Sequence, residues 1–234
     1  MAEQKKRNPR FVTPKGVLVY PHVVTGKPDT KYVGSGVYHT YVKMPEDAEL
    51  FDAKTGKSVG KCSDFLTEKL DASFEKFSEE HNGKKKKGKV VEVTEADPPF
   101  YIDEGELFVK TKLNAYVEPT NGEPFTQAPA LFDAKGKPTK PKRVWNGTIA
   151  KVAFEVVPYF NQKDSEAGIT LRLKAIQIIE LSTGGDMDGG AFGFGQEEGY
   201  EDGDDGDDDS QGFDEEEGYE GNDEENEEDD GGDF

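Results

Sequence analysis

Rings and cations alternate with apolar side chains along residues 106–117, ELFVKTKLNAYV. On an extended strand, every second side chain points to the same face of the sheet. The face suited to a core would consist of Leu107, Val109, Thr111 and Leu113. The opposite face would consist of Phe108, Lys110, Lys112, Asn114 and Tyr116. Aromatic rings stack on nucleobases and ammonium groups pair with phosphates, so this second face predicts a surface for single-stranded nucleic acid.

Two further segments, 148–157 and 169–181, repeat this arrangement. The odd positions of 169–181 form an apolar stripe, and the even positions include Thr170, Arg172 and Lys174. The candidates on and just after the facing segment are Lys151, Tyr159 and Phe160. Two adjacent rings after a proline fit base stacking and core packing equally well, so both interpretations stay open for this pair.

Other candidates lie where a ring stands near a basic residue or after prolines. The stacking candidates are Tyr32, Tyr101 and Trp145, and the phosphate candidates are Lys31, Arg143, Lys84 and Lys85. The last two begin the basic run KKKKGK. Such a run after a helix is as well explained by a solvated loop as by phosphate contact.

Several kinds of site are not indicated. TGKS at 55–58 resembles the end of a phosphate-binding loop, but Phe51 stands where the pattern requires glycine. The three histidines are dispersed along the chain, at His22, His39 and His81. Cys62 is the only cysteine, so we predict no disulfide, no zinc site and no cofactor. No nucleophile stands with a base and an orienting acid, and we therefore expect a binding protein and not an enzyme.

Charge divides the 234-residue chain into two parts. The formal net charge is -20, but residues 183–234 hold 24 Asp and Glu and no Lys, Arg or His. Residues 1–182 hold the other 25 acidic residues and all 29 basic ones, so this part is slightly basic. The acidic part has no Val, Ile or Leu and 14 Gly, a composition that cannot offset the entropy of ordering. We predict a folded domain over 1–182 and a disordered acidic tail over 183–234.

The folded part reads as mainly β. Strand-like segments rich in β-branched and aromatic residues cover 16–24, 36–43, 106–117, 148–157 and 169–181. NQKDSEAG, between the last two, predicts the turn of a long hairpin. One helix is predicted over 62–83, with its apolar stripe at Leu66, Leu70, Phe74 and Phe77. One helix among five or more strands indicates a small barrel or sandwich capped by that helix. No secretory signal or membrane span is visible, so we expect an intracellular protein.

The acidic tail ends in a single ring, Phe234. A polyanion tethered near a cationic groove competes with phosphates at high effective concentration. Once nucleic acid displaces it, the tail can bind basic proteins, with carboxylates supplying attraction and the ring supplying register. The alternative is that Phe234 is a chance end of a solubilising tail. The tail residues that we expect to bind partners are Phe234, Asp233, Asp230 and Asp229.

Several stretches of the sequence resemble single-stranded DNA-binding proteins of tailed bacteriophages, of the short-tailed phage replication type. These stretches are KVAFEVVPYF, ITLRLKAIQIIEL, PPFYIDEGELFVKTKLNAYV and the acidic terminus GGDF. The resemblance covers most of the chain in pieces and is poor over 44–90. It implies an OB-fold, a five-stranded β-barrel with one capping helix, and sequence-independent binding of single-stranded DNA. Tyr159 falls on a base-stacking position of the family, and the family's second ring falls on Asn161.

The resemblance also implies partners and a place of action. It implies a homodimer and tail contacts to the phage DNA polymerase and helicase-primase, in replication, recombination and repair in the cytoplasm of the infected bacterial host. Three alternatives stay open on the residues alone. They are an acidic chaperone or DNA mimic that sequesters basic proteins, a nuclease with an unrecognised active site, and a binder of RNA.

Overall fold

The computed structural model describes residues 8–31, 33–86, 89–119 and 122–182. Its elements are β1 (Arg10–Val12), β2 (Gly16–His22), β3 (Val37–Pro45), β4 (Glu49–Asp52), β5 (Ser58–Lys61), α1 (Cys62–His81), β6 (Lys85–Lys86), β7 (Lys89–Val90), β8 (Thr94–Glu95), β9 (Phe100–Asp103), β10 (Glu106–Asn114), β11 (Tyr116–Val117), β12 (Phe125–Thr126), β13 (Ala130–Phe132), β14 (Ile149–Asn161) and β15 (Glu166–Glu180). The predictions for Tyr32 and for the tail over 183–234, with Asp229, Asp230, Asp233 and Phe234, lie outside the described residues.

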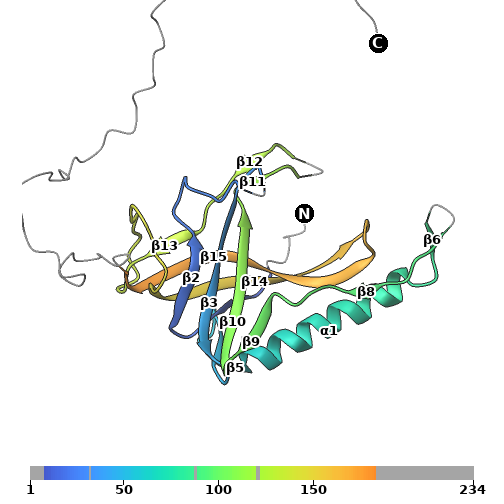
Figure 1. Cartoon of the computed structure of the whole chain (residues 1–234), viewed down its shortest axis with the longest axis horizontal. Coiled ribbons are helices and arrows are strands. Elements are labelled where there is room, and N and C mark those ends of the chain that lie inside the picture. Colours follow the sequence, from blue (N-terminus) through green and yellow to red (C-terminus); the bar gives the residue numbers. More distant parts are fainter. Residues whose placement is uncertain (1–7, 32, 87–88, 120–121, 183–234) are drawn as a thin grey trace, which may run out of the picture. The chain divides into compact units, whose positions relative to one another are not determined.

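Five strands close into a barrel (Figure 1). β15 pairs with β10, β10 with β3, β3 with β2, β2 with β14, and β14 pairs back onto β15. Four of these pairings are antiparallel, and the pairing of β10 with β15 is parallel. A closed five-stranded barrel with one helix against it is the OB-fold arrangement. The predicted mainly β, OB-fold architecture is therefore confirmed.

The alternation along β10 places the core as expected, but the predicted apolar stripe of odd positions in 169–181 holds only as far as Leu173. Beyond the register shift between Ala153 and Phe154 of β14, the buried residues of β15 are Ile176 and Ile178, and Ala175 and Ile179 are half-buried. Leu107, Val109, Thr111 and Leu113 are all buried inside the barrel. Phe154 and Leu171, from β14 and β15, are fully buried in the same core. Because side chains alternate between faces, the intervening residues of β10 must face outward, toward solvent.

β14 and β15 form a long hairpin that projects beyond the barrel over α1 (Figure 1). The strands run further into NQKDSEAG than the sequence predicted, and only residues 162–165 turn the chain. Within this turn the Asn161 Nδ2 donates to Asp164 Oδ2 over 2.6 Å, and the Lys163 backbone N–H donates to Asn161 Oδ1 over 3.0 Å. Such local side-chain bonds stabilise tight turns.

α1 is the predicted helix, with one change in its buried stripe. Leu66 and Leu70 are buried as expected, but the next buried residue is Ser73, whereas Phe74 is only half-buried. The Ser73 hydroxyl donates to the backbone carbonyl of Gly168 over 2.8 Å. This hydrogen bond brings the helix close to the backbone of β15, so a small residue fits where a phenyl ring would not. The described part of the chain contains no helix with the length and apolar character that a membrane crossing requires.

Candidate nucleic-acid interface

The outward face of β10 continues across its neighbours on both sides. Phe108, Lys110 and Lys112 lie in register with Lys43, Tyr41 and His39 of β3. On the other side of β10, Lys112 is the register partner of Arg172 in β15. The sequence placed Lys112 and Arg172 on separate strands without a relation between them, and the parallel β10–β15 pairing makes them neighbours.

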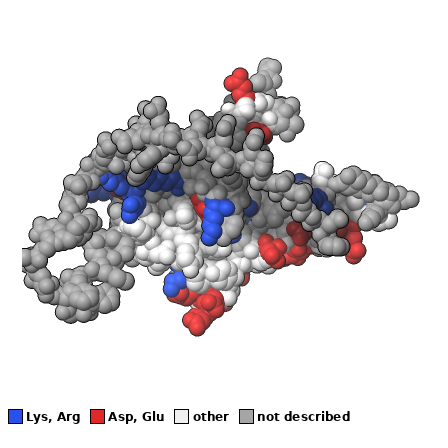
Figure 2. All heavy atoms as spheres, turned by 45° about the horizontal axis from the view of Figure 1, so that its top comes forward, with Lys and Arg blue, Asp and Glu red and all other residues white. Residues whose placement is uncertain are grey.

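A groove of about 450 Å³ lies where this face meets the β14–β15 hairpin. Its lining residues are Lys112, Leu113, Asn114, Val117, Phe125, Gln127, Tyr159, Thr170, Arg172 and Lys174. Three cations and two rings line it, and no acidic side chain does among the described residues. Figure 2 shows Lys and Arg gathered over the upper part of one face of the molecule, while most Asp and Glu lie below them. A groove of this kind attracts a polyanion and offers rings to its bases.

Tyr159 is held on the backbone of β15. It pairs in register with Gly168, and a Cβ at Gly168 would lie 3.1 Å from the tyrosine hydroxyl oxygen and 3.2 Å from Cζ. A side chain at position 168 would therefore displace the ring from this place. Burial raises the pKa of the Tyr159 phenol, and the carboxylates of Glu166 and Asp97 raise it further.

A buried carboxylate organises the cations of the groove. The Glu155 side chain is 8% exposed and lies opposite Arg172 in the β14–β15 register. Its carboxylate accepts a hydrogen bond from Arg10 Nε over 3.3 Å, and it lies 3.7 Å from Arg172 Nη1 and 3.8 Å from Lys174 Nζ. Arg172 and Lys174 remain 44% and 30% exposed, so both keep donors for a ligand. Fixing them in advance lowers the entropic cost of binding a phosphate.

A second group of rings lies further along the same face. The ring of Phe108 stacks on Tyr101, with centroids 4.8 Å apart and planes 3° from parallel. Tyr41 meets Tyr101 edge-on at 6.2 Å, and the Lys110 ammonium lies 5.4 Å from the centre of the Tyr41 ring. Tyr101 is 49% exposed. The predicted candidates Phe108, Lys110 and Tyr101 are thus brought together, and Tyr41 joins them although the sequence reasoning missed it.

Tyr20 is a further ring that the sequence reasoning missed. It is 65% exposed and has a φ of 50°, an uncommon conformation for an aromatic residue. The register of β2 with β3 shifts between Val19 and His22, so Tyr20 lies in a bulge. Its backbone N–H donates to Asn146 Oδ1 over 2.6 Å. Bulges redirect side chains near functional sites, and no local pattern in the sequence marks this one.

Phe125 is the other ring that the sequence reasoning missed. It is an exposed residue of β12 that lines the groove with Tyr159. β12 pairs with β11, which contains Tyr116. The Tyr116 hydroxyl donates to Glu118 Oε1 over 3.0 Å, and Tyr116 does not line the groove itself. A two-residue strand gives too short a pattern to show which face it presents.

Phe160 has partners within the protein. Its ring stacks on His81 with centroids 4.1 Å apart and planes 8° from parallel, and Phe77 lies 5.8 Å away in a similar orientation. Both partners belong to α1. Of the two interpretations open for this ring, the structure provides the packing contact, and we leave Phe160 out of the interface.

The remaining candidates are spread over other regions. Lys151 lines a separate hollow with Phe132 and Gln177, and Lys84 lines one beside His81. Arg143 lies 5.4 Å from the ring centre of Trp145, and both line a third hollow that includes Tyr20. The backbone N–H of Lys31 donates to Asp29, and Lys85 contributes its backbone to β6.

The structure corrects the expectation that the histidines lie apart. His22 and His39 face each other across β2 and β3, with ring centroids 4.9 Å apart. Asp29, from the connection between these strands, hydrogen-bonds His39 over 3.1 Å. Residues 17 positions apart in the chain become neighbours because the two strands pair.

The fold resembles those of solved phage proteins. gp2.5, a single-stranded DNA-binding protein encoded by bacteriophage T7, aligns with a TM-score of 0.60 at 22% identity, over 83% of this chain and 98% of that one. The single-stranded DNA-binding protein of bacteriophage Enc34, in complex with single-stranded DNA, aligns with a TM-score of 0.44 at 13% identity, over 76% of this chain and 94% of that one. No protein-family model and no curated protein matches the sequence.

Proposed function

We propose that this protein binds single-stranded DNA without sequence specificity, with the strand lying in the groove between β10, β12 and the β14–β15 hairpin. The observation that carries the proposal is the groove lining, which combines three cations and two rings without a carboxylate. Phosphates pair with Lys112, Arg172 and Lys174, and bases stack on Tyr159 and Phe125. Stacking does not depend on base identity, because every base has a π-face.

The bound DNA strand continues along the outward face of β10. Lys110 and the stacked pair of Tyr101 and Phe108 lie on the same face as Lys112, so cations and rings alternate beyond the groove. Proteins that bind single strands without sequence preference combine a charged track with successive stacking rings. This chemistry needs no bond-making group, so the protein acts as a binding protein and not as an enzyme.

The fold of gp2.5 supports this function by likeness. From that likeness and from the acidic composition of 183–234, we extend the proposal to phage DNA replication in the cytoplasm of a bacterial host. The acidic segment competes with DNA for the groove and, when displaced, recruits a DNA polymerase and a helicase-primase, with the chain acting as a homodimer. Recombination and repair would use the same coating of single strands.

The test is a salt titration of binding to a labelled oligo-dT by fluorescence anisotropy. Tyr159→Ala should weaken binding by one stacked ring, about 1–3 kcal/mol, or roughly 5–150-fold. Lys112→Gln should lower the slope of log K against log salt by about 0.7, the value for one phosphate contact to a single strand. Lys57→Gln, in the turn between β4 and β5, is the matched control and should leave both quantities close to wild type.

Two outcomes would count against the proposal. If Tyr159→Ala and Lys112→Gln bound oligo-dT as the wild type does, the groove would not be the binding site. If oligo-rU bound much more tightly than oligo-dT, RNA would be the substrate, because stacking and phosphate contacts alone do not exclude the 2′-hydroxyl.

The proposed role of the acidic segment has its own test. A chain that ends at Ser182 should bind oligo-dT more tightly than the full chain at low salt, and the difference should shrink as salt screens the competition. Equal or weaker binding by the shortened chain would contradict competition for the groove while leaving the groove assignment intact.

A further inference from the structure

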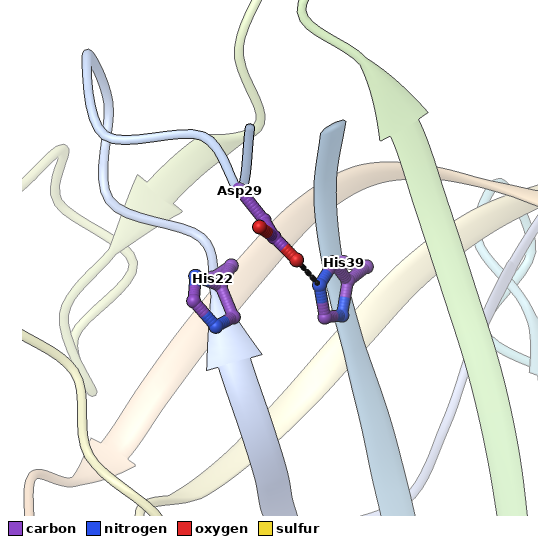
Figure 3. Close-up of side chains that lie close together, drawn as sticks. All are labelled: His22, Asp29 and His39. Atoms are coloured by element: carbon purple, nitrogen blue, oxygen red, sulfur yellow. Dashed lines mark hydrogen bonds and ion pairs between the residues drawn. The ribbon is translucent and has the colours of Figure 1, made fainter. Parts of the chain in front are cut away.

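We infer that His22, Asp29 and His39 form a binding site for one divalent metal ion of the zinc class. Figure 3 shows the three side chains converging from β2, from the β2–β3 connection and from β3. One ligand atom from each lies within 4.8 Å of the other two. Two imidazoles and one carboxylate are a ligand set that zinc accepts in protein sites.

Two of the three ligands already lie at coordination spacing. His39 Nε2 and Asp29 Oδ2 are 3.1 Å apart. In a tetrahedral zinc site with bonds of about 2.0–2.1 Å, two ligand atoms lie roughly 3.3 Å apart. An ion can therefore replace the hydrogen bond between these atoms with little movement of either residue. The Lys31 backbone N–H, which donates to the other carboxylate oxygen of Asp29 over 2.9 Å, holds the carboxylate in this orientation.

His22 supplies the third ligand by a small rotation. Its side chain is exposed, so its ring can turn without displacing packed neighbours. The bulge between Val19 and His22 brings it opposite His39, with the ring planes at 31°. Three protein ligands leave one position of a four-coordinate ion open for water or another ligand.

The second nitrogen of His39 sets the expected strength of the site. His39 Nδ1 is buried and has no hydrogen-bond partner among the described residues. When the metal takes Nε2, the proton of that nitrogen moves to Nδ1, where no acceptor lies. Loss of such an outer hydrogen bond weakens metal affinity by about 10–100-fold. We therefore expect a site of moderate affinity that selects zinc-class ions over Mg²⁺, because imidazole ligands suit the former.

The ion would reinforce the fold beside the groove. It ties Asp29 to both strands, and His39 is the register partner of Lys112, a groove residue. The inference does not depend on the proposed function, since binding of the ion can be measured without DNA.

The experiment titrates the full chain with Co²⁺ and with Zn²⁺ in excess Mg²⁺, which occupies the many exposed carboxylates. We expect one Co²⁺ with visible ligand-field bands, displaced by one Zn²⁺. His22→Gln and Asp29→Asn should each weaken binding at least 10-fold, and His39→Gln more. His81→Gln is the matched control, since His81 lies on α1, and it should bind as the wild type does.

Thermal unfolding supplies a second measurement, because a ligand that binds the folded state raises its stability. Zn²⁺ should raise the unfolding temperature of the wild type and of His81→Gln, and should not raise that of His22→Gln. The inference is overturned if the wild type shows no saturable site above the Mg²⁺ background, or if folded His22→Gln binds Zn²⁺ as tightly as the wild type.

Discussion

Gly168→Ala tests the geometry that holds the Tyr159 ring on β15. The added Cβ would lie 2.8 Å from Ala96 Cβ and 3.1 Å from the Tyr159 hydroxyl oxygen, both inside ordinary contact distance. Ala96 has no side-chain rotation that would relieve the first contact, so the backbone must shift there, and the second contact displaces the tyrosine ring. Overpacking of this kind costs about 1–3 kcal/mol of folding stability. If the ring leaves its place, oligo-dT binding should also weaken by up to the value of one stacked ring, about 1–3 kcal/mol.

A double-mutant cycle separates the two effects. In a Tyr159→Ala background the ring is gone, so Gly168→Ala should weaken oligo-dT binding by less than twofold and destabilise the fold less than it does alone. Anisotropy and urea unfolding measure the two quantities on the same four proteins. Gly34→Ala is the control, because an added Cβ there meets nothing within 4 Å. Unchanged DNA binding by folded Gly168→Ala, with Tyr159→Ala impaired, would refute the link between Gly168 and the ring.

Three further predictions concern buried groups. Glu155→Gln removes the negative charge shared by Arg10, Arg172 and Lys174 and should lower the free energy of unfolding by about 1–3 kcal/mol. An unchanged midpoint of urea unfolding would show that the carboxylate does not organise these cations. Ser73→Ala removes the hydrogen bond to the Gly168 carbonyl and should cost about 1 kcal/mol in the same assay, whereas Ser63→Ala, at an exposed hydroxyl of the same helix, should cost less. Burial raises the pKa of the Cys62 thiol to about 12, so the thiolate forms only as pH approaches that value. A thiol reagent at pH 8 should therefore react slowly with the folded protein and rapidly with the protein unfolded in urea. A fast reaction without urea would contradict the burial of Cys62.

The strands and the helix were predictable because their patterns are local. β10 shows why, since its alternation over nine residues defines a core face and an outward face whatever its neighbours are. The β14–β15 hairpin was predictable from its turn residues, although both strands extend further than their apolar patterns. Of the proposed interface, Lys112, Arg172 and Lys174 came from this periodicity, and Tyr159 came from its place after a proline and from the family resemblance; all four line one groove.

Two of the missed rings, Tyr20 and Phe125, depend on features that no local pattern records, whereas Tyr41 lies on the regular outward face of β3. Tyr20 lies in a bulge and Phe125 lies in a strand of two residues, so neither lies in a regular alternation of side chains that would predict its orientation. Phe160 could stack on a base or pack on a helix, and the packing contact is known only from the tertiary structure, which places His81 and Phe77 beside it.

By itself, the sequence determined the charge division between 1–182 and 183–234, the mainly β class, the predicted helix, and which side chains of β10 face outward. Only the tertiary structure decided which of these outward residues meet. Lys112 lies beside Arg172 because β10 pairs in parallel with β15, and His22 meets His39 and Asp29 because β2 pairs with β3 across a bulge. The physical reason is that periodicity reports the face of a strand, whereas register and strand order are set by packing of the whole barrel.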